Sequence, residues 1–164
     1  ALEDVQSDEG EGNNLGVSAD QALVNIWRPS KFNSRASFFV YFGPELVTLL
    51  KAGSYQQFSV QPGPFTLMLQ SQTWEILKGT LEAGKTYNVL VSVAQGYNRA
   101  VARLEMVSAN DPRIAELASA KPRTVDPKSM VKYVKKYGPQ GKTMYSKLQT
   151  GKAKSKEILA SDGE

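Results

Sequence analysis

The chain contains neither cysteine nor histidine, and these two absences exclude much familiar chemistry. Without cysteine there is no disulfide and no thiolate nucleophile, and without histidine there is no imidazole base to activate a serine. The usual zinc sites depend on the same two residue types. We therefore expect no cofactor and no metal ion. No apolar run approaches the roughly 20 residues of a membrane-spanning helix, so the sequence predicts no transmembrane segment.

Motifs for catalysis are scarce as well. A serine nucleophile would need a lysine as its base, and Lys51 and Ser54 lie close together only in a predicted turn, where exposure explains both. The acids of the central region occur singly near predicted strand ends and not in pairs. Phosphate-binding glycine loops and calcium loops are missing. We predict that the protein is not an enzyme; a hydrolase with unrecognised serine–lysine or carboxylate chemistry is the remaining catalytic alternative.

Charge is segregated along the chain, although the net charge is only +4. The first 16 residues hold five acids and no base, residues 17–110 hold eight bases and five acids, and residues 111–164 hold twelve bases and six acids. An anionic partner would therefore prefer the C-terminal end. Residues 1–19 have too little apolar surface to offset the entropy of ordering, and we predict a disordered acidic leader.

Two strand-like runs flank the turn Gln61-Pro62-Gly63-Pro64 at the centre of the chain. Apolar or aromatic side chains lie at positions 55, 58 and 60 and at 65, 67 and 69, and Gly63 suits a turn position with positive φ, so the pattern predicts an antiparallel hairpin. Similar signals predict further strands, with an interruption or bulge at Gly79; their ranges are 22–27, 36–42, 45–50, 73–81, 86–93 and 100–107. About seven to eight short strands, with a turn every ten or so residues, are typical of an antiparallel β-sandwich or small barrel. We assign residues 20–110 to this domain.

Four short motifs follow one another in this region: ALVNIWRPS at 22–30, LKAGSY at 50–55, QPGPFTL at 61–67 and LEAGKTY at 81–87. In this order they resemble a family of bacterial envelope domains of unknown function, which are frequently lipoproteins. The resemblance implies a small β-sandwich exported to the periplasm or outer envelope, with its signal peptide removed. Phe65 stands where that family commonly has histidine. The lipid-bearing cysteine is also missing, so lipid anchoring would require a cysteine ahead of Ala1.

Arg28 and one aromatic strand are the candidate sites within the sandwich. Arg28 follows Trp27 at a strand end, where it could stack on a ring and bond strand-end carbonyls, or capture a carboxylate or phosphate. Four rings occupy five positions of the next strand, and successive side chains point to opposite faces. One face is therefore predicted to present rings to a helix, a partner or a ligand. The rings are Phe38, Phe39, Tyr41 and Phe42.

After Asn110 the apolar period changes from two to about 3.6, so residues 111–138 are predicted to form a helical extension. Asp111-Pro112 begins a short helix, with Ile114, Leu117 and Ala118 on one face. Asp126-Pro127 begins a second, predicted to end at Gly138-Pro139; its apolar stripe comprises Met130, Tyr133, Val134 and Tyr137. This stripe could cover the sandwich, lie on an anionic membrane or dock into a partner's groove. The candidate binding residues here are Lys128, Lys132, Tyr133, Lys135, Lys136 and Tyr137.

Residues 139–164 read as a basic flexible tail. The sequence favours a non-enzymatic cell-envelope accessory or adaptor that binds another envelope protein through its sandwich and its basic C-terminal arm. The alternative is a module for cell-wall glycan or anionic lipid, whereas nucleic acid is disfavoured because exported proteins seldom meet it. The oligomeric state and the order of the arm are left open.

Overall fold

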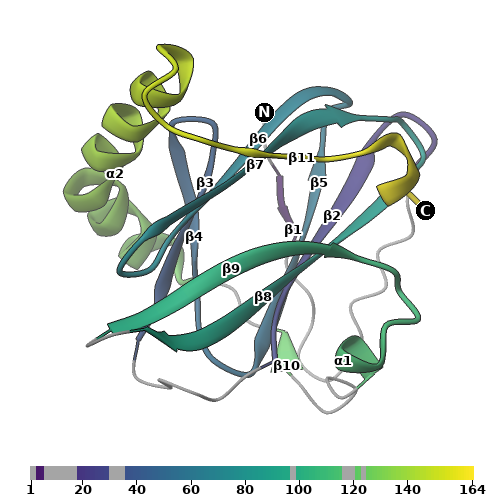
Figure 1. Ribbon diagram of the computed structural model, residues 1–164, viewed down its shortest axis with the longest axis horizontal. Coiled ribbons are helices and arrows are strands. Elements are labelled where there is room, and N and C mark those ends of the chain that lie inside the picture. Colours follow the sequence, from purple (N-terminus) through teal and green to yellow (C-terminus); the bar gives the residue numbers. More distant parts are fainter. Residues whose placement is uncertain (1–2, 6–17, 30–35, 97–98, 116–120, 123–124) are drawn as a thin grey trace.

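Two β-sheets face each other, and a long helix covers the outer face of one of them (Figure 1). The computed structural model describes residues 3–5, 18–29, 36–96, 99–115, 121–122 and 125–164. The predicted mainly β sandwich with C-terminal helices is confirmed. Its elements are β1 (Glu3–Val5), β2 (Ala22–Arg28), β3 (Phe38–Phe42), β4 (Glu45–Leu50), β5 (Ser54–Val60), β6 (Gly63–Gln70), β7 (Trp74–Leu81), β8 (Thr86–Gly96), β9 (Arg99–Val107), α1 (Pro112–Ala115), β10 (Lys121–Pro122), α2 (Pro127–Gln149), β11 (Lys156–Glu157) and the 3-10 turn η2 (Ala160–Asp162).

The six-stranded sheet has the order β1-β5-β2-β8-β9, with β10 also paired to β5, and the five-stranded sheet has the order β11-β7-β6-β3-β4. Both sheets are mixed and not purely antiparallel. At the centre of the six-stranded sheet β2 runs parallel to β8, with Val24 opposite Tyr87. Strands β3 to β7 lie between β2 and β8 in the sequence, and such a long connection allows the chain to return in the same direction.

The predicted hairpin around Gly63 is wrong. Strands β5 and β6 belong to different sheets, so the turn carries the chain from one layer to the other. Gly63 does take a positive φ, 120°. Phe58 and Leu67 therefore meet in the core between the sheets and are not neighbours within one sheet. Alternation identifies the inward face of a strand but does not name its pairing partner.

The prediction of an irregularity at Gly79 is also wrong. Strands β6 and β7 pair without a register shift, and Phe65 lies opposite Gly79. A Cβ atom at position 79 would lie 2.7 Å from the Cβ of Ile158, so this glycine makes room for a distant segment. The bulge lies instead between β3 and β4, at Val40 and Tyr41.

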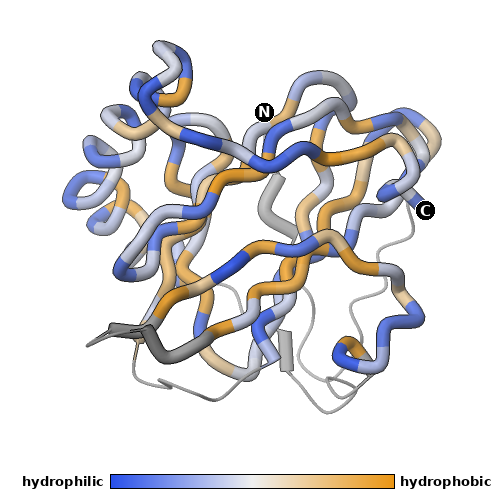
Figure 2. Tube along the Cα trace, viewed as in Figure 1, coloured by the Kyte–Doolittle hydropathy of each residue, from blue (hydrophilic) through white to orange (hydrophobic). Residues whose placement is uncertain are grey.

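The main core fills the space between the sheets, and it contains the inward side chains of almost every long strand. Within β2 the predicted division holds, since Ala22, Val24 and Ile26 face this core while Trp27 packs on the other side, near Ile114 of α1. Figure 2 shows the hydrophobic residues concentrated along the strands and many hydrophilic residues along α2. The sheets thus hold the apolar surface and the helix adds a polar exterior.

The second helix begins as predicted but does not end at Gly138-Pro139. Asp126 caps it by accepting a hydrogen bond from the Ser129 amide at 3.2 Å, and Pro127 occupies its first turn. The helix then continues through Pro139 to Gln149. A Cβ atom at Gly141 would lie 2.4 Å from the Tyr41 ring, so this glycine permits close packing on the sandwich, and that packing outweighs the helix-breaking tendency of the sequence.

Both chain ends are more ordered than predicted within the described residues. In the leader, Glu3–Val5 pairs with β5, while residues 6–17 lie outside the described part, as do Leu117 and Ala118. In the tail, β11 pairs with β7, and Glu164 exchanges two backbone hydrogen bonds with Thr86, at 2.8 and 2.6 Å. The yellow segment in Figure 1 shows this path across the sandwich.

Candidate functional site

Arg28 is enclosed at the end of β2, with none of its surface exposed. Its Nη1 donates hydrogen bonds to the carbonyl oxygens of Ala36 and Leu50, at 2.7 and 2.8 Å, and its guanidinium lies 3.8 Å from the centre of the Phe38 ring. Burial lowers the pKa of Arg28 to about 10, which still leaves it charged at neutral pH. These contacts match the first alternative from the sequence, a structural role that joins strand ends. Capture of an external anion would require this side chain to leave its enclosure.

The rings of β3 are divided between two faces, as the alternation requires, but none of the four is exposed. Phe38 and Phe42 lie in the main core, where Phe42 makes edge-on contacts with Phe58 and Phe65 at 5.0 Å. Phe39 and Tyr41 face outward and are covered by α2. The rings are therefore not exposed, and of the three occupants expected for the outward face, a helix, a partner or a ligand, it is the helix α2 that covers it.

The inner side of α2 packs against the outward rings of β3. Tyr137 stacks on Phe39 with ring centroids 4.4 Å apart, and its carbonyl oxygen accepts a hydrogen bond from the Tyr41 hydroxyl at 3.0 Å. Tyr133 packs in the same cluster. The predicted apolar stripe thus covers the sheet, apart from Val134, which is 44% exposed. Tyr133 and Tyr137, proposed from sequence as binding residues, serve mainly to hold the helix in place.

The outer side of α2 carries a row of six lysines, which we call the lysine face. It comprises Lys128, Lys132, Lys135, Lys136, Lys142 and Lys147, and all six are exposed. The helix from Pro127 to Gln149 contains no acid. With 3.6 residues per turn the six positions fall within an arc of about 140°, and from first to last they span about 28 Å along the axis.

No lysine of this face takes part in an ion pair within the described residues. Lys136 lies 5.3 Å from the Tyr137 ring, and the other five extend along the same exterior. Two apolar side chains border the row: Val131 is 71% exposed and Val134 is 44% exposed. The arrangement is a fixed, positively charged surface with a small apolar margin.

Sequence reasoning identified four of the six lysines. Lys142 and Lys147 were assigned to the flexible tail because Gly138-Pro139 reads as a helix end. The seven-residue spacing of Lys128, Lys135 and Lys142 was the available signal, since seven residues make about two helical turns. That spacing carries the charge pattern across the glycine and proline without interruption.

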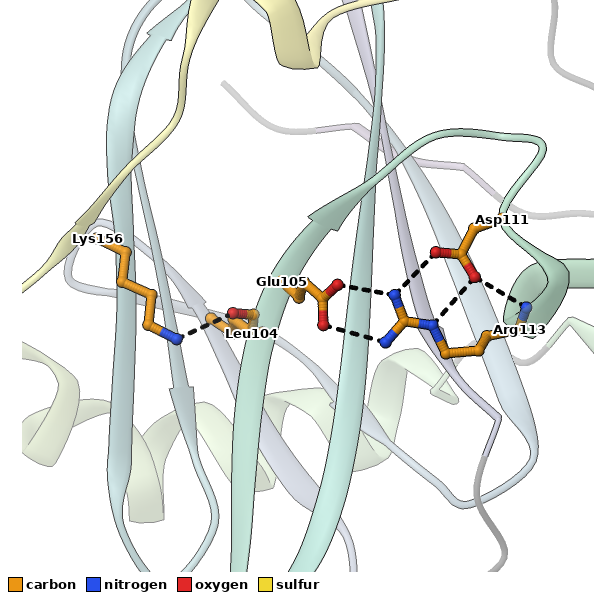
Figure 3. A network of polar contacts seen from close by, with 5 residues as sticks. All are labelled: Leu104, Glu105, Asp111, Arg113 and Lys156. Carbon is orange, nitrogen blue, oxygen red and sulfur yellow. Dashed lines mark hydrogen bonds and ion pairs between the residues drawn. The ribbon is translucent and has the colours of Figure 1, made fainter.

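A second charged cluster lies at the other end of the sandwich, where Arg113 of α1 bridges Glu105 of β9 and Asp111 (Figure 3). The guanidinium approaches the two carboxylates to 2.7 and 2.8 Å. Hydrogen bonds from Arg113 lower the pKa of Asp111 to about 2 and also lower the pKa of Glu105. Because its charges are paired with one another, this cluster stabilises the corner and offers little net charge to a partner.

Other chemistry is sparse in the part of the chain that the structure describes. It contains no group of three or more acidic side chains that could together hold a metal ion. None of its helices combines the length and apolar character needed to cross a bilayer.

No protein-family model matches the chain, and no curated protein matches it significantly.

Proposed function

We propose that this protein is a non-enzymatic accessory protein of the bacterial cell envelope, and that it binds an acidic partner protein on the lysine face of α2. The observation that supports this proposal most is that the two sides of α2 have different roles. The inner side is packed against the five-stranded sheet, while the outer side presents six lysines and no acid. A rigid row of like charges favours rapid association with a surface of opposite charge.

A protein partner fits this surface better than a membrane. A helix that lies in a membrane interface buries its apolar side among the lipids. In α2 that side already contacts Phe39, Tyr41 and Met68, so it is not available without undocking the helix. Val131 and Val134 provide a small apolar margin, which suits the edge of a protein interface.

The envelope location is supported by the order of the four motifs between Ala22 and Tyr87, through their resemblance to exported bacterial domains. Binding to cell-wall glycan or anionic lipid is the alternative. Both would use the same lysines, so the test must separate these ligands by their composition and not by their charge.

The test uses the full chain and two double variants of equal charge change. Lys132→Glu with Lys135→Glu reverses the lysine face, whereas Lys51→Glu with Lys85→Glu reverses two exposed lysines in turns of the sandwich. Immobilised proteins are incubated with bacterial envelope extract at low and moderate salt, and any recovered protein is purified and rebound. We expect one acidic protein to bind the wild type and the turn variant but not the α2 variant.

Vesicles with about a third anionic lipid and purified cell-wall glycan are tested in parallel. Retention on either one, released by salt and lost in the α2 variant, would replace the protein partner with that ligand. Equal binding of all three proteins to every probe would remove the lysine face from the proposal.

A further inference from the structure

The last part of the chain runs across one side of the sandwich and pairs with both sheets, at the edge of the five-stranded sheet and at the start of β8, an inner strand of the six-stranded sheet. We call residues 156–164 the strap and residues 150–155 its linker. The strap first adds β11 to the edge of β7 in the five-stranded sheet. Its far end then pairs with Thr86 of β8 in the six-stranded sheet. In Figure 1 the yellow chain runs from the end of α2 through the linker and then along the strap to the C-terminus.

One side chain anchors the strap in the core. Ile158 is only 8% exposed and belongs to the main core cluster, and its amide donates to the carbonyl of Lys78 at 2.9 Å. Gly79 makes this entry possible, because a side chain there would meet both the Cβ and the carbonyl oxygen of Ile158, at 2.7 and 2.8 Å. The site thus has a shape that matches one isoleucine.

The far end of the strap fits a second feature. A Cβ atom at Gly163 would lie 2.8 Å from the Tyr87 ring, so only glycine allows this approach. The Glu164 carboxylate accepts hydrogen bonds from the Asn88 side chain at 3.4 Å and from the Ala109 amide at 3.1 Å. We call this binding site the slot; it is formed by Lys78, Gly79, Thr86, Tyr87 and Asn88. The slot therefore fits a segment that has an isoleucine, a glycine five residues later and then an acid.

The linker makes fewer contacts than the strap, and among its apolar side chains Ala153 packs against the cluster under α2. Gly151 takes a φ of 77°, and the amide of Lys152 bonds back to Lys147 at 2.8 Å, which closes the end of α2. From there to Ser155 no hydrogen bond to either sheet is recorded within the described residues. Six residues can extend to about 20 Å, so a change of direction at Gly151 would carry the strap well away from its own slot.

We propose that the slot also accepts the strap of a second copy, so that two chains exchange residues 156–164 and form a dimer. Every copy carries the matching isoleucine, glycine and acid at the right spacing. Exchange would preserve all the contacts described above and would change only the linker, which makes it a low-cost route to association. This inference is independent of the proposed function, since the strap and its slot include no residue of the lysine face.

The absence of cysteine allows a direct test. Lys78 and Glu157 are opposite each other in the β7–β11 pair, and neighbouring strands are about 4.8 Å apart, within the range that a disulfide bridges. One chain carries Lys78→Cys and another carries Glu157→Cys. The two are mixed in native buffer at increasing concentrations, oxidised gently and resolved without reductant. Exchange predicts a covalent heterodimer whose yield rises with protein concentration.

Two controls make the result specific. Lys142→Cys, on the exposed side of α2, replaces Glu157→Cys to measure random collision. Gly79→Val is then added to one chain at a time. It should abolish the heterodimer when it is in the Lys78→Cys chain, because that slot is closed. It should maintain or raise the yield when it is in the Glu157→Cys chain, because that strap has lost its own slot.

A heterodimer yield equal to that of the Lys142→Cys control at every concentration would overturn the proposal. Equal loss from Gly79→Val in either chain would overturn it too, because a general effect on folding, and not slot occupancy, would then explain the result.

Discussion

Helix α2 and the strap are both C-terminal additions to the sandwich, but they are held in different ways. The helix covers a sheet face with several rings, among them Tyr133 and Tyr137, and Gly141 brings its backbone against Tyr41. The strap is held by Ile158, by a few backbone hydrogen bonds, by the carboxylate of Glu164, and by Lys156, which pairs with Glu75 at 3.3 Å and donates to the Leu104 carbonyl at 3.4 Å. A broad aromatic contact makes α2 a fixed platform for its lysines, whereas a narrow contact leaves the strap free to exchange.

The largest loss of stability is expected from a substitution that loosens the packing of α2 on the sandwich. Gly141→Val places a side chain against the Tyr41 ring, where a Cβ atom alone would lie 2.4 Å away. We expect a loss of about 3 kcal/mol in the free energy of unfolding, typical of an overpacked core. Valine is a better helix former than glycine, so the loss would come from packing. Urea unfolding measures it, with Ser146→Val on the exposed side as the control; equal midpoints would show that α2 is not closely docked.

Ile158→Ala tests the strap in the same way. Removing a buried isoleucine to alanine costs about 2 kcal/mol or more, and this site lies at the edge of the core, so we expect a value near 2. Hydrogen exchange should become faster at the amides of Ile158, Thr86 and Glu164, while the amides of α2 keep their protection. Loss of protection in α2 as well would mean that the helix and the strap unfold together and the contrast between them is false.

Acid should weaken the corner held by Arg113, which lies outside both α2 and the strap. The folded state lowers the pKa of Asp111 from its ordinary 3.8 to about 2 and lowers that of Glu105, so their contribution is complete above the ordinary values and is lost as the pH falls toward 2. Trp27 lies in the same cluster as Ile114 of α1 and can report the change by its fluorescence. Arg113→Gln should remove this pH dependence. A wild-type transition that persists in the variant would place its cause elsewhere.

The smallest change in stability is expected when lysines are removed from the exposed side of α2. Lys135→Gln with Lys142→Gln removes two charges from the exposed side of α2, where surface substitutions usually change stability by less than about 0.5 kcal/mol. We expect an unchanged urea midpoint together with weaker binding of the acidic partner. A clear loss of stability would show that these lysines hold the helix and do not serve a partner.

Local patterns in the sequence predicted most strands and the start of α2. Alternation gave the two faces of β2, and Asp126-Pro127 gave the helix cap. What the sequence could not give was the identity of long-range neighbours. Gly63 serves a crossing between sheets as well as a hairpin, so the same turn signal suited both.

The candidate site was only partly predictable, because it too depends on contacts between residues that are distant in the sequence. Gly138 reads as a helix end and Gly79 as a bulge, yet α2 continues beyond Gly138 and Gly79 admits Ile158, which is distant in the sequence. Gly141 likewise admits the ring of Tyr41. The aromatic strand was correctly divided between two faces, and the apolar stripe of the second helix suited a cover for the sandwich, but no local pattern showed that the covered face would be that of Phe39 and Tyr41. At these positions the tertiary contacts stabilised a structure that the local propensities of the residues did not predict.

The parallel pair at the centre of the six-stranded sheet also sets the order of events during synthesis. Asn25 of β2 donates to Asn88 of β8 at 3.0 Å, across 63 positions of the chain. Strand β2 is synthesised before β8, and all of β3 to β7 lie between them. Contacts of such separation slow folding, to milliseconds or seconds in all-β domains. One side of β2 therefore stays unpaired until β8 is available, and an unpaired strand edge of this kind is open to aggregation.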